Sequence, residues 1–301
     1  YHQVYDLGLE YQQRYETATM KSASEGAICA YSLAGGFSIR SHPELTIGMA
    51  FNWYAQSLLN DNIRQVTWES SRKLPSGTEI VTFRTEETLD DFHGYNFTFG
   101  LLWDAYEREE NLLTLGFVCQ TPFRAEMDMD VMDIDNLGQV THRTDEPVRL
   151  DMDFPLSLGF GAHYRFSDSL STALDVQWTQ WSEYTYDTAT WTPGDDAAAV
   201  RLGFEQLWFP RSVRQSVLAW RGGVFYEPRP AWSGILPVYG VSVGLGWTVK
   251  EQFSIDLAYQ FRWGQEDLRF NRLRDDGTVI TNELDYEVEE HWLIGSVIVY
   301  F

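Results

Sequence analysis

The sequence predicts an all-β fold: a transmembrane antiparallel β-barrel of about 12 strands, or 14 if an N-terminal part is missing. Apolar and polar residues alternate with period two along most of the chain, which is the pattern of β-strands. No apolar run of about 18 residues occurs, so no transmembrane helix is available. A closed barrel is the remaining spanning structure, because lipid cannot satisfy exposed backbone groups. We assign residues 1–301 to one domain.

The composition fits strands with one apolar and one wet face. The chain is 44% hydrophobic and 15% aromatic, yet its mean hydropathy is −0.31. Its formal net charge of −22 excludes nucleic acid as a partner, because phosphates need Lys and Arg. The acidic residues are expected to solvate loops and the lumen. Bridging of lipopolysaccharide phosphates through divalent cations is the alternative.

Twelve segments carry the alternation, an even count such as closed bacterial barrels have. In the third segment Ile47, Met49 and Phe51 share one parity, while Thr46 and Asn52 have the other. The segments are 1–15, 27–40, 45–56, 95–104, 113–119, 154–166, 170–179, 199–209, 218–226, 239–247, 253–263 and the run that ends at residue 301.

The connections alternate between short and long, as expected if the two kinds lie on opposite sides of a membrane. The short ones are 41–44, 105–111, 167–169, 210–213 and 249–252, which we place with the C-terminus on the periplasmic side. The long ones are 16–26, 57–92, 126–147, 187–198, 227–237 and 264–290. Within 57–92, the pair 63–72 and 79–86 is expected to prolong the third and fourth strands beyond the membrane. Prolines exclude a strand interior over 227–237.

The C-terminal run resembles the insertion signal of bacterial outer-membrane barrel proteins, which the barrel-assembly machinery reads. The residues that carry this resemblance are Leu293, Val297, Val299 and the terminal Phe301. The resemblance implies a bacterial outer-membrane location, with membrane lipids and lipopolysaccharide as neighbours. A soluble β-sandwich that ends in a core strand is the alternative. As the closing strand, this run is expected to pair with residues 1–15.

Large aromatic residues recur near the strand ends, where they are expected to form interface girdles at the level of the lipid headgroups. A carbohydrate-stacking slide is the alternative, but it needs aromatic side chains in the lumen. The girdle residues are Tyr15, Trp53, Trp103, Tyr164, Trp178, Trp220, Trp247 and Trp263. Cys29 and Cys119 are predicted to be free residues on the lipid face, because their strands lie too far apart for a disulfide.

Several segments together resemble the FadL-type outer-membrane transporters of long-chain fatty acids and other hydrophobic molecules. The closest are 154–166, which contains Tyr164-Arg165, and 174–182, which contains Asp175 and Trp181-Ser182. Further likenesses lie at 121–123, 221–226 and 256–259. The resemblance implies passive transport of hydrophobic molecules, without a cofactor, by a monomer.

The chain departs from the family pattern in two features. That family typically has fourteen strands and an N-terminal plug with an Asn-Pro-Ala motif, and the dipeptide Asn-Pro does not occur here. No plug residue can therefore be carried over. No signal peptide precedes Tyr1, so the sequence is expected to be a mature form or to lack an N-terminal part.

Parity selects the candidate ligand-binding residues. Tyr54, Leu102, Leu112, Val118 and Phe225 are expected to point inward, where apolar side chains would be costly in a purely aqueous pore. Packing on each other or on a plug is the alternative explanation. Glycine-rich stretches at 35–36, 159–161, 222–223 and 244–246 either relieve crowding or mark a bend where the wall opens.

The tract 126–135 alternates acidic and apolar residues. Met127 and Met129 are expected to form a soft apolar mouth for a lipid on the face opposite the carboxylates. The carboxylates themselves could take Ca²⁺, but the tract lacks the glycine and the terminal glutamate of an EF-hand loop. A solvated strand extension is therefore favoured, and no metal site is assigned.

Three function classes remain distinct at this point. An enzyme would need a histidine with acidic or nucleophilic partners near the rim. His93, His142 and His291 have acidic neighbours in sequence, but no catalytic residue is assigned because their surroundings lack the pattern of barrel phospholipases. A passive channel for hydrophobic molecules is the reading we favour. A general porin for polar solutes and a barrel with only a structural role are the alternatives.

Overall fold

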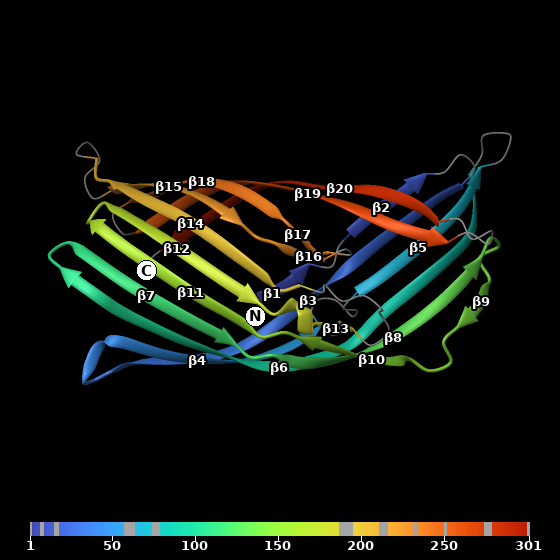
Figure 1. Cartoon of the computed structure of the whole chain (residues 1–301), viewed down its shortest axis with the longest axis horizontal. Helices are drawn as coiled ribbons and strands as arrows, with labels where there is room; N and C mark the ends of the chain where they lie inside the picture. The colour runs from blue at the N-terminus through green and yellow to red at the C-terminus, as the bar shows by residue number, and fades with distance from the viewer. Residues whose placement is uncertain are drawn as a thin grey trace.

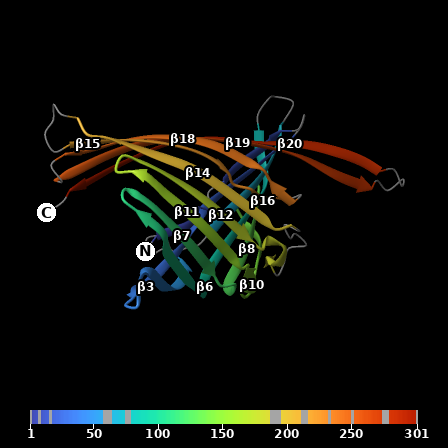
Figure 2. The ribbon, with the colours of Figure 1, turned by 60° about the vertical axis from the view of Figure 1, so that its left-hand side comes forward.

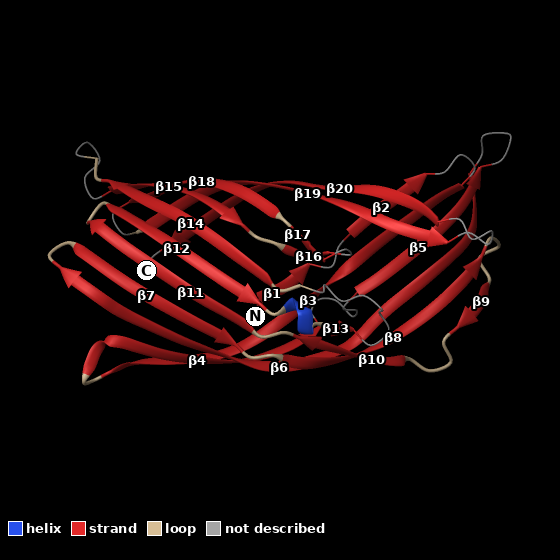
Figure 3. Ribbon diagram, viewed as in Figure 1, coloured by secondary structure: helices blue, strands red, loops and turns tan. Residues whose placement is uncertain are grey.

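The computed structural model describes residues 2–6, 9–14, 18–56, 64–73, 79–186, 195–210, 216–231, 234–249, 252–273 and 279–299. These residues are almost entirely β-strand, and a single 3₁₀ turn at Trp181–Glu183 is the one helical element among them (Figure 3). No helix in this part of the chain is long and apolar enough to cross a membrane.

Twelve of the described strands, which we call the staves, form the main antiparallel sheet, as the alternation predicts. Their order is β1 (His2–Asp6), β3 (Ala18–Ile39), β4 (His42–Gln56), β6 (Glu79–Arg108), β7 (Asn111–Gln120), β11 (Ser157–Ser167), β12 (Leu170–Thr179), β14 (Ala197–Trp208), β15 (Ser216–Tyr226), β18 (Val238–Val249), β19 (Phe253–Leu273) and β20 (Val279–Val299). Short turns join them at one end, on the left of Figure 1.

Further strands prolong the staves at the opposite end, which we call the extension. They are β2 (Leu9–Arg14), β5 (Arg64–Lys73), β8 (Phe123–Asp135), β9 (Val140–Arg143), β10 (Val148–Phe154) and β13 (Thr185–Tyr186). Strand β5 lies between β3 and β6 beyond the end of β4, while β8 lies between β6 and β10 beyond the end of β7. The predicted continuation of strands three and four is therefore confirmed.

The extension also corrects two loop predictions, those for 16–26 and 264–290, of which residues 18–26, 264–273 and 279–290 form strands. Residues 126–135 form the strand extension that the sequence favours, and the segment expected as one strand over 1–15 contains β1 and β2. The physical reason is that strand pairing satisfies backbone groups regardless of composition. Outside lipid neither face has to be apolar, so polar segments continue the ladder. The proline-rich stretch stays outside the main sheet, as β16 (Arg229–Ala231) and β17 (Gly234–Leu236).

The last strand pairs with β19 from Val279 to Val299, and this hairpin reaches beyond the end of the β18 ladder at Gly264 (Figure 2). Leu293, Val297 and Val299 are exposed on its outer face. In the described part of the chain β20 has no ladder other than that with β19, and β1 and β2 pair with β3. The expected pairing of the last run with residues 1–15 is not among these ladders. Tyr1 and Phe301 lie outside the described residues.

The two faces of the sheet differ as the parity predicts. On β4 the outward Met49, Phe51 and Trp53 are exposed, whereas the inward Asn52 and Tyr54 are buried. Residues that pair across a ladder share a face, so this assignment extends to every stave.

Outward aromatic rings gather at two levels of the wall. At one level Tyr31 lies 5.4 Å from Trp53, and Tyr239 lies 6.2 Å from Trp263, between ring centroids. Trp103, Tyr164, Trp220 and Trp247 lie nearer the short-turn end. These positions suit the predicted girdles. Tyr15 lies outside the described residues.

Cys29 and Cys119 are not joined by a disulfide, as predicted. Cys29 is nonetheless fully buried rather than lipid-exposed.

Candidate binding site in the lumen

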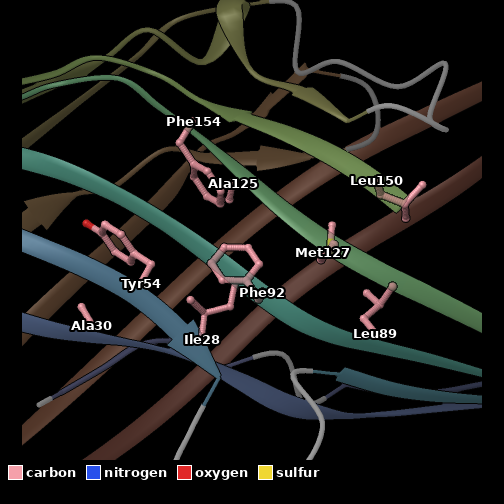
Figure 4. Close-up of a cluster of buried hydrophobic side chains, with 9 residues drawn as sticks. All are labelled: Ile28, Ala30, Tyr54, Leu89, Phe92, Ala125, Met127, Leu150 and Phe154. Carbon is pink, nitrogen blue, oxygen red and sulfur yellow. The ribbon is translucent and has the colours of Figure 1, made fainter. Parts of the chain in front are cut away.

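The main buried cluster lies on the inner face where the membrane staves meet the extension. Its residues come from five strands and point toward one another in Figure 4: Ile28, Ala30, Tyr54, Leu89, Phe92, Ala125, Met127, Leu150 and Phe154. Phe123, Met129 and Met152 pack against it. We call these residues together the inner cluster.

Three aromatic rings of the inner cluster stack in a row. Tyr54 and Phe123 have centroids 4.6 Å apart at 9°, and Phe123 and Phe154 have centroids 4.5 Å apart at 3°. Phe92 meets Phe154 edge-on at 6.3 Å. The row is possible because Gly94 opposes Tyr54 across the ladder and leaves space above its backbone. A Cβ atom at Gly94 would lie 2.9 Å from the ring of Phe123.

Neutral polar side chains satisfy one another beside the ring stack. Gln120 donates to the Tyr54 hydroxyl at 2.8 Å, and Asn52 donates to the Asn96 side chain at 2.8 Å. Ser32 in turn donates to Asn52 at 2.7 Å. Buried polar groups are costly unless they are paired, and here amides and hydroxyls pair without any ionised group. The site therefore offers no charge to a ligand from this side.

A hollow of about 470 Å³ lies on the inner face nearer the short-turn end. Leu102 and Val118 are among its apolar side chains, and Gly116, Gly159 and Gly161 also line it. Asp175 and Arg201 lie at its edge. Leu102 reaches over Gly116 and Val118 over Gly159, at 3.3 and 3.7 Å from where a Cβ would stand. These glycines therefore make room for neighbouring side chains. This agrees with the first of the two expectations for the glycine-rich stretches, that they relieve crowding. The register shifts at Ser38–Ile39, Asp90–His93 and Asp104–Tyr106 lie away from the glycine pairs.

One half of the lumen wall is neutral. From the row of Leu102 and Gly116 to the row of Tyr54 and Gly94, no Asp, Glu, Lys or Arg occupies a described inward ladder position. This holds for β3, β4, β6, β7, β8, β10 and β11. We call this surface the neutral wall. It joins the inner cluster to the hollow without interruption by charge.

The other half of the lumen, from β12 to β20, carries charged side chains in linked ion pairs. Arg221 binds Glu205 at 2.6 Å and Asp256 at 2.5 Å. Glu227 accepts from Arg201 at 2.6 Å and lies 3.3 Å from Arg262.

A further pair extends this charged half. The Arg229 guanidinium donates two hydrogen bonds, of 2.7 and 3.0 Å, to the carboxylate of Glu290. Each of these arginines is thus neutralised by at least one carboxylate.

The structure brings together some of the predicted ligand-binding residues and separates others. Tyr54, Met127 and Met129 belong to the inner cluster, and Leu102 and Val118 line the hollow. Leu112 lies near the short-turn end, paired with Glu107 and Arg165.

Phe225 lies on the charged half of the lumen. Its ring covers Gly240, and the guanidinium carbon of Arg262 lies 5.3 Å from the ring centroid.

Sequence reasoning missed Phe123 and Phe154 as members of the site. The phase of the alternation changes between Gln120 and Phe123, and again between Phe154 and Ser157, so that all four of these residues face inward. Pro122 and Pro155 lie at these breaks. A proline pair at matching positions of two neighbouring strands is the signal that could have revealed the change of phase.

The carboxylates of 126–135 that alternate with Met127 and Met129 face outward, and two of them pair with cations. Glu126 contacts Arg149 and lies 3.6 Å from His93, and Asp130 binds Arg143 at 3.0 Å. No group of three side chains suited to a metal ion occurs in the described residues. The tract is therefore a strand extension with an ion-paired outer face.

Acid is expected to weaken the extension through Asp153. Hydrogen bonds from Arg124, at 2.7 and 3.0 Å, hold the pKa of this carboxyl below its usual value. A lowered pKa contributes stability that is present above the unfolded-state pKa, about 4, and is lost as pH falls through the folded-state value. Thermal unfolding in detergent between pH 6 and pH 2 should show this loss.

Asp153→Asn and Arg124→Gln are both expected to flatten that pH profile. The effect should be modest and should shrink with added salt, since the pair is partly exposed. A profile in Asp153→Asn as steep as that of the wild type would contradict this assignment.

The histidines considered for catalysis lie on the outer face or in an exposed strand. His93 faces Glu126, and His142 lies on β9. Nδ1 of His291 lies 2.7 Å from the Tyr259 hydroxyl.

A curled antiparallel sheet with an apolar outer face, aromatic girdles and a partly apolar lumen defines a transmembrane β-barrel of the bacterial outer membrane. The profile of the family described as outer membrane protein transport protein (OMPP1/FadL/TodX) matches residues 2–300. The chain belongs to this family. It is accordingly a transport protein for hydrophobic compounds in the outer membrane of a Gram-negative bacterium, and not an enzyme.

One solved structure supports the fold, and two others are similar to the chain at lower scores. A FadL homologue of Pseudomonas aeruginosa is 14% identical, with a TM-score of 0.58 over 94% of this chain and 75% of that one. A monoaromatic hydrocarbon channel, CymD, is 13% identical, with a TM-score of 0.47 over 85% and 72%. The toluene transporter TodX of Pseudomonas putida is 12% identical, with a TM-score of 0.41 over 96% and 80%. No curated protein sequence matches the chain.

Proposed function

We propose that the protein lets molecules with a long apolar part, such as long-chain fatty acids, cross the outer membrane passively along the neutral wall. The observation that carries this proposal is the continuous uncharged surface from the inner cluster to the hollow. Each methylene that leaves water for such a surface contributes about 0.8 kcal/mol. A fatty acid supplies such a chain, and so does an uncharged ester or hydrocarbon.

The residues would act in sequence along this path. Tyr54, Met127 and Met129 take up the apolar part at the extension, where methionine adapts to ligands of different shape. Leu102 and Val118 then contact it in the hollow. No residue would form a covalent bond to the cargo, and the concentration gradient alone drives transport.

A pair of measurements separates this function from that of a polar-solute porin. Uptake of a radiolabelled long-chain ester by a Gram-negative host that lacks its own hydrophobic channel should rise when the protein is produced. Planar bilayers that contain the protein should show little steady ionic current. A large, steady current without ester uptake would contradict the proposal and favour a porin.

Enlarging Gly94 is expected to impair capture. In Gly94→Val the new side chain meets Phe123 and Ala125, at 2.9 and 3.1 Å from the Cβ position, so the ring stack must open. Uptake of the ester should fall by roughly threefold to tenfold, since displacement of one packed ring costs about 1 kcal/mol. Gly35→Val is the control, because no atom lies within 4 Å of its Cβ position and it faces outward on β3, paired with Met49. Equal uptake by the two variants would place the cargo path elsewhere.

The C-terminal strand supports a second proposal, about assembly. Leu293, Val297 and Val299 present an apolar outer edge that suits recognition by the barrel-assembly machinery and contact with membrane lipids and lipopolysaccharide. Deletion of Phe301 should lower the fraction of protein recovered folded in the outer membrane. Unchanged recovery would remove Phe301 from the signal. A monomer is expected, and the mass of the detergent-solubilised protein tests this.

A further inference from the structure

The hollow borders the charged half of the lumen at the ladder pair of Asp175 and Arg201, and both residues line it. Asp175 on β12 leans over Gly161 on β11, and its Oδ1 atom lies 2.7 Å from where a Cβ of Gly161 would stand. It lines the same hollow as Leu102 and Val118. A molecule in the hollow therefore meets a carboxylate at its edge.

Arg201 and Arg262, which lie beyond Asp175 on this half of the lumen, already form ion pairs with Glu227. Arg201, the ladder partner of Asp175, donates to Glu227 at 2.6 Å and reaches Gln177 at 3.4 Å. Arg262, which also contacts Glu227, lies 5.6 Å from the ring centroid of Trp292 and is covered by aromatic side chains. An incoming anion would have to displace Glu227 from two arginines.

The neutral wall, on the other side of the hollow, offers no cation to a bound carboxylate. Its polar groups are amides and hydroxyls that already pair with one another, as in the Gln120–Tyr54 and Asn52–Asn96 bonds. A carboxylate that leaves water for such a surface loses its hydration without gaining a cation, and this is strongly unfavourable. The nearby charge of Asp175 adds repulsion.

From this arrangement we infer that the channel selects uncharged hydrophobic molecules over carboxylate anions, with Asp175 and the Glu227 ion pairs as specificity determinants. The inference rests on the proposed function and narrows its cargo to esters, hydrocarbons and other neutral molecules. Fatty acids would pass only in their protonated form.

The test compares ligands that share one alkyl chain and differ in charge. Binding of methyl tetradecanoate and of tetradecanoate is measured at pH 8, where the acid is ionised, with the protein in nanodiscs. The ester should bind at least about tenfold more tightly than the anion. Asp175→Asn and Glu227→Gln should each strengthen anion binding about fivefold relative to ester binding. Tetradecylammonium, a cation, should bind more tightly than tetradecanoate to the wild type.

Glu126→Gln is the matched control, because it removes the same charge from the outer face of β8. It should leave both affinities as they are. Equal binding of ester and anion by the wild type would overturn the charge selection while the proposed function stands. Failure of both ligands to bind would overturn the proposed function and the selection with it. If Glu126→Gln and Asp175→Asn raise the affinity for tetradecanoate equally, then the net charge of the protein, and not Asp175 itself, determines how weakly the anion binds.

Discussion

Replacement of Met127 by aspartate is expected to reduce uptake of a long-chain ester at least about tenfold. The Met127 side chain is 3% exposed and lies among Leu89, Leu150 and the ring stack. A carboxylate at this position would lie in the inner cluster without a cation, which costs several kcal/mol or forces it to stay protonated. An ionised aspartate would disrupt the apolar surface that binds the cargo. In either protonation state the variant lacks the methionine side chain that contacts the cargo. Uptake by cells that produce the variant measures the effect.

Two further variants keep this prediction testable if Met127→Asp folds poorly. Met127→Leu preserves volume and apolarity, and should retain uptake near the wild-type value. Met127→Gln is uncharged and of similar length, and should fall between the two. Asp128→Asn changes the neighbouring outward residue and should not affect uptake. Full uptake by heat-modifiable, folded Met127→Asp would place the cargo path away from the inner cluster.

Replacement of Gly264 by valine is expected to destabilise the wall of the barrel. A Cβ atom at Gly264 would lie 2.6 Å from the carbonyl oxygen of Pro237 and 3.2 Å from Val238 Cγ2. The oxygen belongs to the backbone, so a rotamer change cannot relieve the clash. Overpacking of this kind costs about 1–3 kcal/mol and more when a strand must shift. Urea unfolding of the detergent-solubilised barrel, followed by its heat-modifiable migration, should reveal the loss.

Gly295→Val provides the control for this stability prediction. Gly295 lies on the neighbouring strand β20, and no atom lies within 4 Å of its Cβ position. Its valine variant should unfold within about 0.5 kcal/mol of the wild type, as surface substitutions usually do. If the two variants unfold at the same urea concentration, the approach of Pro237 to Gly264 does not constrain the strand.

Part of the candidate site could be predicted from the sequence, because parity is a local property of the chain. Tyr54, Leu102 and Val118 were expected to point inward, and each lies on the inner face within an unbroken strand. Phe154 was missed because the phase of the alternation changes near Pro155. The extent of strand pairing beyond the membrane was also underestimated. A polar composition indicates that a segment is exposed to solvent, but it does not exclude that the segment pairs with a neighbouring strand.

The sequence alone determined the class of protein: the period-two alternation, the twelve staves with their short turns, the aromatic levels and the acidic composition all follow from neighbouring residues. The tertiary structure alone decided the division of the lumen into a neutral and a charged half. That division depends on which strands become neighbours and in which register, as when Asp175 meets Gly161 and Arg201. Register joins residues far apart in the chain, so a local pattern cannot specify it.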